Sequence, residues 1–171
     1  MVKLEQPALL ASSKPMWVEI DVLPRKKIYT ELSLRYMVEG RQVFKLRSSI
    51  SENEVDHILT WLEKAVKTRR NLLCETFSAM LAYEQVIVIE QRRILKQDYE
   101  MILQDGGQLD YPYPFFYSVD LLVNPDPNGN VNTGIGMRFD GLGYSQLHRF
   151  LTEFNREIQA ASRLGKVGKD A

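Results

Sequence analysis

The residue types that most often carry out catalysis or bind metals are few in this chain, and they lie far apart in the sequence. The 171 residues include a single cysteine, Cys74, and two histidines, His57 and His148. No two of these residues have the short spacing of a metal site, such as His-x-x-x-His or Cys-x-x-Cys. Ser145 has the first glycine of a Gly-x-Ser-x-Gly nucleophile elbow but lacks the second. The sequence therefore predicts no metal and no cofactor, and it argues against a nucleophilic enzyme.

Two turn-rich segments match ligand-binding loops only in part. Asp126-x-Asn128-x-Asn130 begins like a calcium loop, but such a loop needs a glycine at position 131 and a carboxylate at position 137, where this chain has valine and methionine. Gly134-x-Gly136 lacks the third glycine of a dinucleotide-binding loop and the lysine of a phosphate loop. We interpret the first segment as a hairpin turn and the second as part of a strand.

The carboxylates of the chain are numerous but scattered, so their spacing predicts no catalytic pair. A polar site between the sheet and the helices would use Asp120, Arg138 and Asp140, which lie in strands of the C-terminal half. Such a site would make the chain a small-molecule-binding protein or a hydrolytic enzyme. This is the second functional hypothesis.

The segment 111–117 is unusual because it contains five aromatic residues and two prolines. The prolines hold Tyr111–Pro114 extended and remove main-chain donors, which favours the edge of a sheet. Exposed tyrosines on a stiff backbone bury a large area on binding at a low entropic cost. In the alternative interpretation, Phe115 and Tyr117 pack inward and the two tyrosines before them cover the rim of the core. We predict a partner-binding surface formed by Tyr111, Tyr113, Phe115 and Phe116.

The formal net charge is zero, with 22 basic and 22 acidic residues. A chain whose main partner is nucleic acid usually carries a surplus of cations, because binding neutralises phosphates. A local basic patch formed by Arg69, Arg70, Arg92 and Arg93 is the basis of a third hypothesis, nucleic-acid binding. However, cations that follow a helix also complement its dipole, and no aromatic residues are interleaved with these arginines. The charge pattern therefore favours a protein partner over nucleic acid.

Apolar residues recur with the period of a strand or of a helix along most of the chain. Alternation predicts strands over Trp17–Leu23, Tyr29–Val38, Gln42–Arg47, Phe115–Val123 and Asn132–Phe139. Helical spacing predicts amphipathic helices over Glu54–Val66 and Tyr144–Ala160. Ser51 and Glu54 form a capping box, and Glu39-Gly40 predicts a hairpin turn. The apolar stripes of the two helices have the same spacing: Val55, Ile58, Leu59, Leu62 and Val66 in the first, and Leu147, Phe150, Leu151, Phe154 and Ile158 in the second.

The stretch 71–104 contains neither glycine nor proline, and its pattern is ambiguous. Leu73, Phe77 and Met80 have the spacing of one helical face, so we predict a helix over Asn71–Ala82. Gln85–Ile89 is rich in β-branched residues, which favours a buried strand. Over residues 83–104, periodicity alone does not separate helix from strand.

Together these patterns predict an α+β fold in which helices pack on one face of an antiparallel sheet. The order of strands and helices suggests two duplicated strand-strand-helix units, which is a hypothesis. We expect one domain over residues 16–162, a loosely ordered segment 1–15 and a flexible tail 163–171. The first 15 residues contain no apolar run long enough for a signal peptide, and the single cysteine fits a reducing compartment. We therefore expect a cytoplasmic protein without a membrane span.

The functional prediction is a non-enzymatic protein-binding module, such as a chaperone, an immunity or inhibitor protein, or a regulatory adaptor. It depends on the scarcity of catalytic groups and on the aromatic segment 111–117. The predicted partner is another protein. An exposed strand edge and the apolar stretch 72–103 also favour a homodimer.

Overall fold

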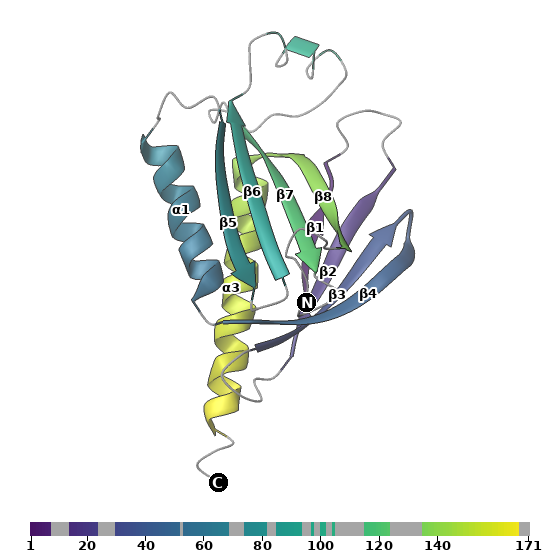
Figure 1. Cartoon of the computed structure of the whole chain (residues 1–171), viewed down its shortest axis with the longest axis vertical. Helices are drawn as coiled ribbons and strands as arrows, with labels where there is room; N and C mark the ends of the chain where they lie inside the picture. The colour runs from purple at the N-terminus through teal and green to yellow at the C-terminus, as the bar shows by residue number, and fades with distance from the viewer. Residues whose placement is uncertain are drawn as a thin grey trace.

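In its described residues, a computed structural model of the chain contains two four-stranded antiparallel sheets and two long helices (Figure 1). It describes residues 1–7, 14–23, 30–51, 53–68, 74–81, 85–93, 115–123 and 135–167, together with positions 97, 100, 101 and 104. Sheet A contains β1 (Val2–Glu5), β2 (Met16–Val22), β3 (Thr30–Val38) and β4 (Arg41–Ile50). Sheet B contains β5 (Cys74–Leu81), β6 (Gln85–Arg93), β7 (Phe115–Val123) and β8 (Ile135–Leu142). Helix α1 (Glu54–Thr68) follows sheet A, and helix α3 (Tyr144–Val167) follows sheet B.

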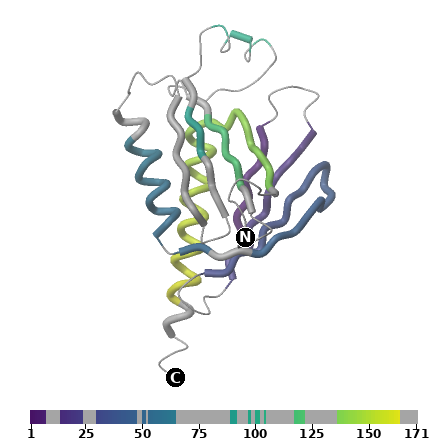
Figure 2. The backbone as a smooth tube through the Cα atoms, in the orientation of Figure 1, coloured from purple at the N-terminus to yellow at the C-terminus, as the bar shows by residue number. Residues whose placement is uncertain are grey.

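In both sheets, neighbouring strands are also consecutive in the chain, so each sheet is a meander with an edge strand at either end. Figure 1 shows α1 beside β5 on one side of sheet B. Sheet A lies on the other side, beside β8, while α3 passes behind the strands (Figure 2). The predicted α+β class with antiparallel strands is therefore confirmed, and the strands form two sheets. The proposed duplication of the two halves stays a hypothesis.

The hydrophobic core lies between the inner faces of the two sheets and the helices. Strand alternation places the core residues, because every second side chain of a strand points to the same face. Val18 of β2, Leu34 of β3 and Val119 of β7 are buried in one cluster with both helices. Tyr36 of β3 links the two sheets directly, since its hydroxyl donates to the carbonyl of Leu121 in β7 at 3.5 Å.

The helices use the predicted apolar stripes. All five stripe residues of α3 are buried, and so are Val55, Ile58 and Leu62 of α1. The helices also contact each other in antiparallel orientation, because Asn155 donates to Asp56 at 3.4 Å and His148 lies 3.2 Å from Glu63. At the start of α1 the Ser51 N–H donates to the Glu54 carboxylate at 2.9 Å, as the capping box predicts.

The predicted hairpin at Glu39-Gly40 is also confirmed. It joins β3 to β4 with φ of 49° at Glu39 and 78° at Gly40. Two successive residues with positive φ give the turn whose twist matches that of a hairpin, and glycine adopts this conformation at little cost.

The helix predicted over Asn71–Ala82 is wrong, because Cys74–Leu81 forms β5. Phe77 and Met80, which have helical spacing, lie opposite Ile89 and Val86 of β6. The β-branched run in β6 is a strand, as its composition favoured. Cross-strand pairing with the β-branched strand β6 outweighs the weak helix propensity of Cys74–Leu81.

The two ends of the chain also differ from the expectation. Residues 1–15 were expected to be loosely ordered, but Val2–Glu5 forms β1, and Val2 and Leu4 are each only 1% exposed. Residues 8–13 lie outside the described part. The last helix continues to Val167, beyond the predicted end at Ala160. Neither described helix combines the length and the apolar character needed to cross a membrane.

Candidate functional site

The outer face of sheet B, which is the face opposite the helices, carries a group of charged side chains centred on Arg138 of β8. Arg138 Nε donates to Asp140 at 2.9 Å, Nη1 to Asp120 at 3.0 Å, and Nη2 to Glu90 at 3.0 Å. Asp120 of β7 lies directly opposite Arg138 in the sheet register, and Glu90 belongs to β6. Strand alternation brings these residues to one face, since Tyr117, Val119 and Phe139 on the same strands point into the core. We call Glu90, Asp120, Arg138 and Asp140 the Arg138 cluster.

The sequence hypothesis expected Asp120, Arg138 and Asp140 in a polar site between the sheet and the helices. The three residues do contact each other, but they lie on the face of sheet B opposite the helices, so the expected location is wrong. The hypothesis also missed Glu90. No spacing in the sequence indicates that Glu90 belongs to this cluster. Glu90 lies in β6, within residues 83–104, where the sequence pattern did not distinguish helix from strand. Two further residues support Asp140. The Ser118 hydroxyl donates to its carboxylate at 2.5 Å, and the side chain of Gln6 binds its main chain.

Burial and neighbouring charge shift the protonation of the Arg138 cluster. Burial is the main cause that raises the pKa of Asp120 above the ordinary 3.8; Arg138 opposes the shift, whereas Asp140 and Glu90 add to it. The hydrogen bonds to Asp140 and Glu90 raise the pKa of the Arg138 guanidinium further, so it stays charged. Three carboxylates face one guanidinium, which leaves a surplus of negative charge.

The chemistry open to the Arg138 cluster is limited by its own contacts. Each of the three guanidinium nitrogens of Arg138 donates to a carboxylate, so a substrate anion would be left with the second N–H groups of Nη1 and Nη2, beside three carboxylates that repel it. The carboxylates in turn are held by Arg138 and Ser118. Within the described residues, no group of three His, Cys, Asp or Glu side chains could hold a metal ion.

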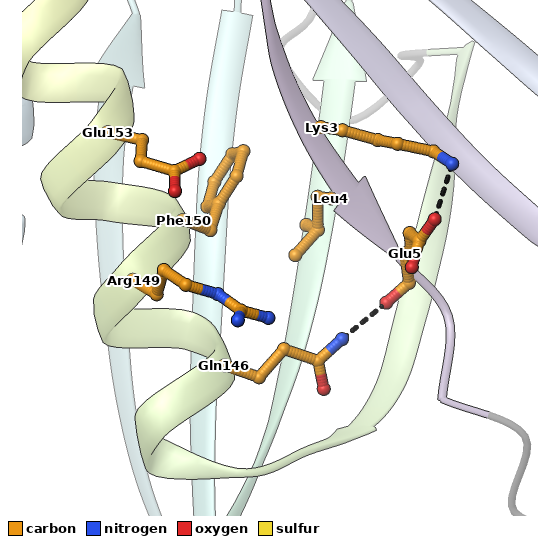
Figure 3. A pocket seen from close by; sticks show the side chains of 7 residues that line it. All are labelled: Lys3, Leu4, Glu5, Gln146, Arg149, Phe150 and Glu153. Atoms are coloured by element: carbon orange, nitrogen blue, oxygen red, sulfur yellow. Dashed lines mark hydrogen bonds and ion pairs between the residues drawn. The ribbon is translucent and has the colours of Figure 1, made fainter.

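A second polar feature is a groove of about 260 Å³ between β1 and α3 (Figure 3). Gln146 of α3 donates to the main-chain carbonyl of Glu5 at 2.9 Å, which caps the free edge of β1. The Lys3 ammonium pairs with the Glu5 carboxylate and lies 4.4 Å from the ring centre of Trp17. The groove is lined by Lys3, Leu4, Glu5, Gln146, Arg149, Phe150 and Glu153.

The predicted partner-binding residues are placed only in part. Phe115 and Phe116 are the first residues of β7, while Tyr111 and Tyr113 lie outside the described residues. For Phe115 and Phe116 the structure describes the main chain and not the side chains. In the alternative interpretation Tyr117 packs inward, and Tyr117 is indeed buried in the core.

The predicted basic patch is placed at the same end of sheet B. Arg92 and Arg93 are the last residues of β6, where they lie opposite Phe116 and Phe115 respectively. Their side chains lie outside the described part of the structure, as do Arg69 and Arg70 altogether. The register therefore brings two of the predicted cations and two of the predicted aromatic residues onto neighbouring strands, which the sequence did not indicate.

The remaining candidates for chemistry are dispersed. Cys74 begins β5, His57 is exposed on α1, and His148 lies beside Glu63 on the neighbouring helix. Ser145 is in the first turn of α3. No protein-family model matches this sequence, and no curated protein matches it.

Proposed function

We propose that the chain is a non-enzymatic protein-binding module, of the chaperone, inhibitor or adaptor type, which docks its partner on the aromatic segment leading into β7. Tyr111, Tyr113, Phe115 and Phe116 would make the contacts. The partner would be another protein in the cytoplasm, and the homodimer expected from the sequence belongs to the same proposal.

The observation that carries this proposal is the position of Phe115 and Phe116 at the N-terminal end of β7. Both residues pair with β6, but β8 ends at Leu142, opposite Tyr117. β7 thus extends past the end of β8, and among the described strands none pairs with this side of Phe115 and Phe116, which leaves a local edge of sheet B there. A partner strand can add main-chain hydrogen bonds at such an edge, and adjacent aromatic side chains supply the buried area of a binding hot spot.

The contacts of the Arg138 cluster also support binding over catalysis. A general acid or base must be within reach of the substrate and free to exchange a proton. In the Arg138 cluster the guanidinium and the carboxylates engage each other, in the way that ion pairs stabilise the solvent face of a sheet.

The groove between β1 and α3 favours a second candidate function, the binding of a small molecule. Arg149 and Glu153 line it with opposite charges, and Phe150 adds an apolar wall. These groups would suit a small zwitterionic ligand. The groove lies between β1 and α3 and does not contain Asp120, Arg138 or Asp140.

The protein-binding proposal is tested by capture from a native extract with the tagged chain, followed by identification of both proteins and nucleic acids. The Tyr113→Ala/Phe116→Ser double variant is compared with wild type, and Met101→Ser serves as the control because Met101 is exposed outside this segment. Thermal melting first establishes that each variant is folded.

We expect one protein to be retained at a stoichiometric level by wild type and by the control, and to be lost with the double variant. Equal retention by the folded double variant would refute docking on the aromatic segment. Nucleic acid as the sole retained macromolecule would refute the protein-binding proposal and favour the arginines at the end of β6. If no macromolecule is retained, the proposal fails in favour of the small-molecule groove.

A further inference from the structure

The strand β4 is a ten-residue edge strand of sheet A. It pairs with β3 on one side, and among the described strands none pairs with its other side. Figure 1 shows β4 at the outer margin of sheet A. Register shifts once, between Tyr36 and Met37, and from Phe44 to Ile50 the pairing with β3 is continuous. This part of β4 therefore presents a regular row of main-chain donors and acceptors, which is the template for an added strand.

The charged side chains of β4 are all cations. Between positions 41 and 50 the sequence contains three cations, Arg41, Lys45 and Arg47, and no carboxylate. All three side chains are exposed. Across the register, Lys45 lies opposite Arg35, but Arg35 already pairs with Glu19 at 3.2 Å and with Asp21 at 3.1 Å. The two carboxylates beside Arg35 are thus engaged, and no ion pair among the described residues includes Arg41, Lys45 or Arg47.

The charge of β4 also limits which strand can add to it. If β4 of a second copy paired with this edge, cations of the two strands would face each other, and like charges on neighbouring strands are destabilising. A strand with carboxylates at alternate positions would instead place an anion beside Lys45 and another beside Arg47. The charge of this edge therefore disfavours the pairings with a second copy that bring the cations together, and it favours an acidic segment.

Nucleic acid is the other polyanion that three cations could attract, but the aromatic residue of this strand is not available for stacking on bases. Phe44 packs on Tyr36 with ring centres 4.2 Å apart, on the core side of the sheet. Single-strand binding normally combines cations with exposed aromatic side chains. The main-chain edge, in contrast, matches the hydrogen-bonding groups of a peptide.

We propose that the free edge of β4 binds an extended acidic peptide segment by strand addition, with Lys45 and Arg47 contacting alternate carboxylates. This inference deepens the proposed protein-binding function, because it names a second contact surface and the chemistry of the segment that it takes. It is independent of Tyr111, Tyr113, Phe115 and Phe116, which lie at or near the start of β7 in the other half of the chain.

The test uses a defined probe, the capped peptide Glu-Val-Glu-Val-Glu-Val-Glu-Val, with binding to the full chain measured by fluorescence anisotropy. The same peptide with lysine in place of glutamate tests the role of charge. A version N-methylated at every residue tests strand pairing, because it lacks main-chain donors along both edges. A 20-residue single-stranded oligodeoxynucleotide tests the phosphate alternative.

The protein variants are Lys45→Glu/Arg47→Glu and a control with the same change in net charge, Arg156→Glu/Arg163→Glu, at exposed positions of α3. We expect the wild type and the control to bind the glutamate peptide. The β4 variant should bind at least about tenfold more weakly, since two favourable charge contacts become repulsive, and it should gain affinity for the lysine peptide. If it does not melt cooperatively, Lys45→Gln/Arg47→Gln replaces it with the same expected loss.

Equal affinity for the N-methylated and the unmodified glutamate peptides would overturn strand addition, because attraction to the charges alone would then explain the binding. Unchanged affinity of the folded β4 variant, or tighter binding of the oligonucleotide than of the glutamate peptide, would also overturn it. If the peptide test fails in any of these ways, the proposed docking on the aromatic segment still stands, provided that capture of the partner protein is lost in the Tyr113→Ala/Phe116→Ser variant. Conversely, if the Tyr113→Ala/Phe116→Ser variant captures the partner as well as wild type does, the result of the peptide test is unaffected.

Discussion

The side-chain amide of Gln6 pairs with both main-chain polar groups of Asp140. Gln6 Nε2 donates to the Asp140 carbonyl at 2.7 Å, and the Asp140 N–H donates to Gln6 Oε1 at 2.8 Å. Gln6 follows β1, the edge strand of sheet A, and Asp140 lies in β8, the edge strand of sheet B. The side-chain amide of Gln6 thus forms the two hydrogen bonds that the main chain of a neighbouring strand would form with Asp140. It joins the edges of the two sheets, although Gln6 and Asp140 lie far apart in the sequence.

Replacing Gln6 should destabilise the fold. Gln6→Glu keeps the shape of the side chain but puts a carboxylate oxygen, in place of a donor, beside the Asp140 carbonyl. We expect its free energy of unfolding in urea to fall by about 0.5–1.5 kcal/mol at pH 7, the usual net contribution of a hydrogen bond, because this pair is exposed. Gln42→Glu, at an exposed position of β4, should change it by less than about 0.5 kcal/mol. A Gln6→Glu variant as stable as wild type would show that the bridge contributes nothing.

The Arg138 cluster should respond asymmetrically to substitution. Arg138→Met leaves Glu90, Asp120 and Asp140 close together without a cation, so we expect a loss of about 1–2 kcal/mol, reduced from the cost of a buried ion pair because the group is partly exposed. Asp120→Asn removes one ion pair but also a carboxylate that burial disfavours, and should stay within about 0.5 kcal/mol of wild type. Urea unfolding measures both. Arg156→Met on α3 is the control, and equal losses in Arg138→Met and Arg156→Met would contradict the role of the cluster.

The raised pKa of Asp120 predicts a pH dependence with a definite sign. Because the folded chain binds the Asp120 proton more tightly than the unfolded chain, this residue contributes most to stability below pH 3.8, its ordinary pKa. The contribution is lost as the pH rises through the raised folded pKa. The stability of Asp120→Asn relative to wild type should therefore increase between pH 3 and pH 7. Parallel unfolding measurements across this range would contradict the account if the difference were constant or decreased.

The N-terminal strand should be part of the stable core. Leu4 is 1% exposed and packs in the cluster shared by both sheets, so Leu4→Ala is expected to lower the free energy of unfolding by about 2–4 kcal/mol. Lys3→Ala, on the opposite face of the same strand, should cost at most about 1 kcal/mol from its contact with Trp17. Thermal and urea unfolding of both variants give the comparison. Similar small effects would indicate that β1 is not held in the core.

Sequence patterns predicted the elements whose signal is local. The helix stripes, the capping box and the Glu39-Gly40 turn each depend on residues within one or two turns of chain. The stripe of α3, the described residues of the α1 stripe, the contact of Glu54 with the Ser51 N–H and the Glu39-Gly40 turn are confirmed. β1 and β5 were missed because their strand character depends on partners elsewhere: Val2 and Leu4 become core residues only beside β2, and Cys74–Leu81 only beside β6.

The same distinction applies to the candidate site. Asp120, Arg138 and Asp140 were brought together because Asp120 and Arg138 belong to two predicted neighbouring strands and Asp140 directly follows the second. Glu90 and Gln6 were missed because their contacts with Arg138 and Asp140 cross between segments 48 and 134 residues apart. The basic edge of β4 could have been found from the absence of any carboxylate between positions 41 and 50, once β4 was known to end the sheet.

The most direct test of the central claim, that the aromatic segment leading into β7 docks a protein, is hydrogen–deuterium exchange on the chain alone and in complex with the protein that it captures. Main-chain pairing at a strand edge slows exchange of the amides involved. The account predicts slowed exchange in peptides covering residues 111–117 on complex formation, with loss of that effect in the Tyr113→Ala/Phe116→Ser variant. Unchanged exchange over 111–117 in a stoichiometric complex would contradict it.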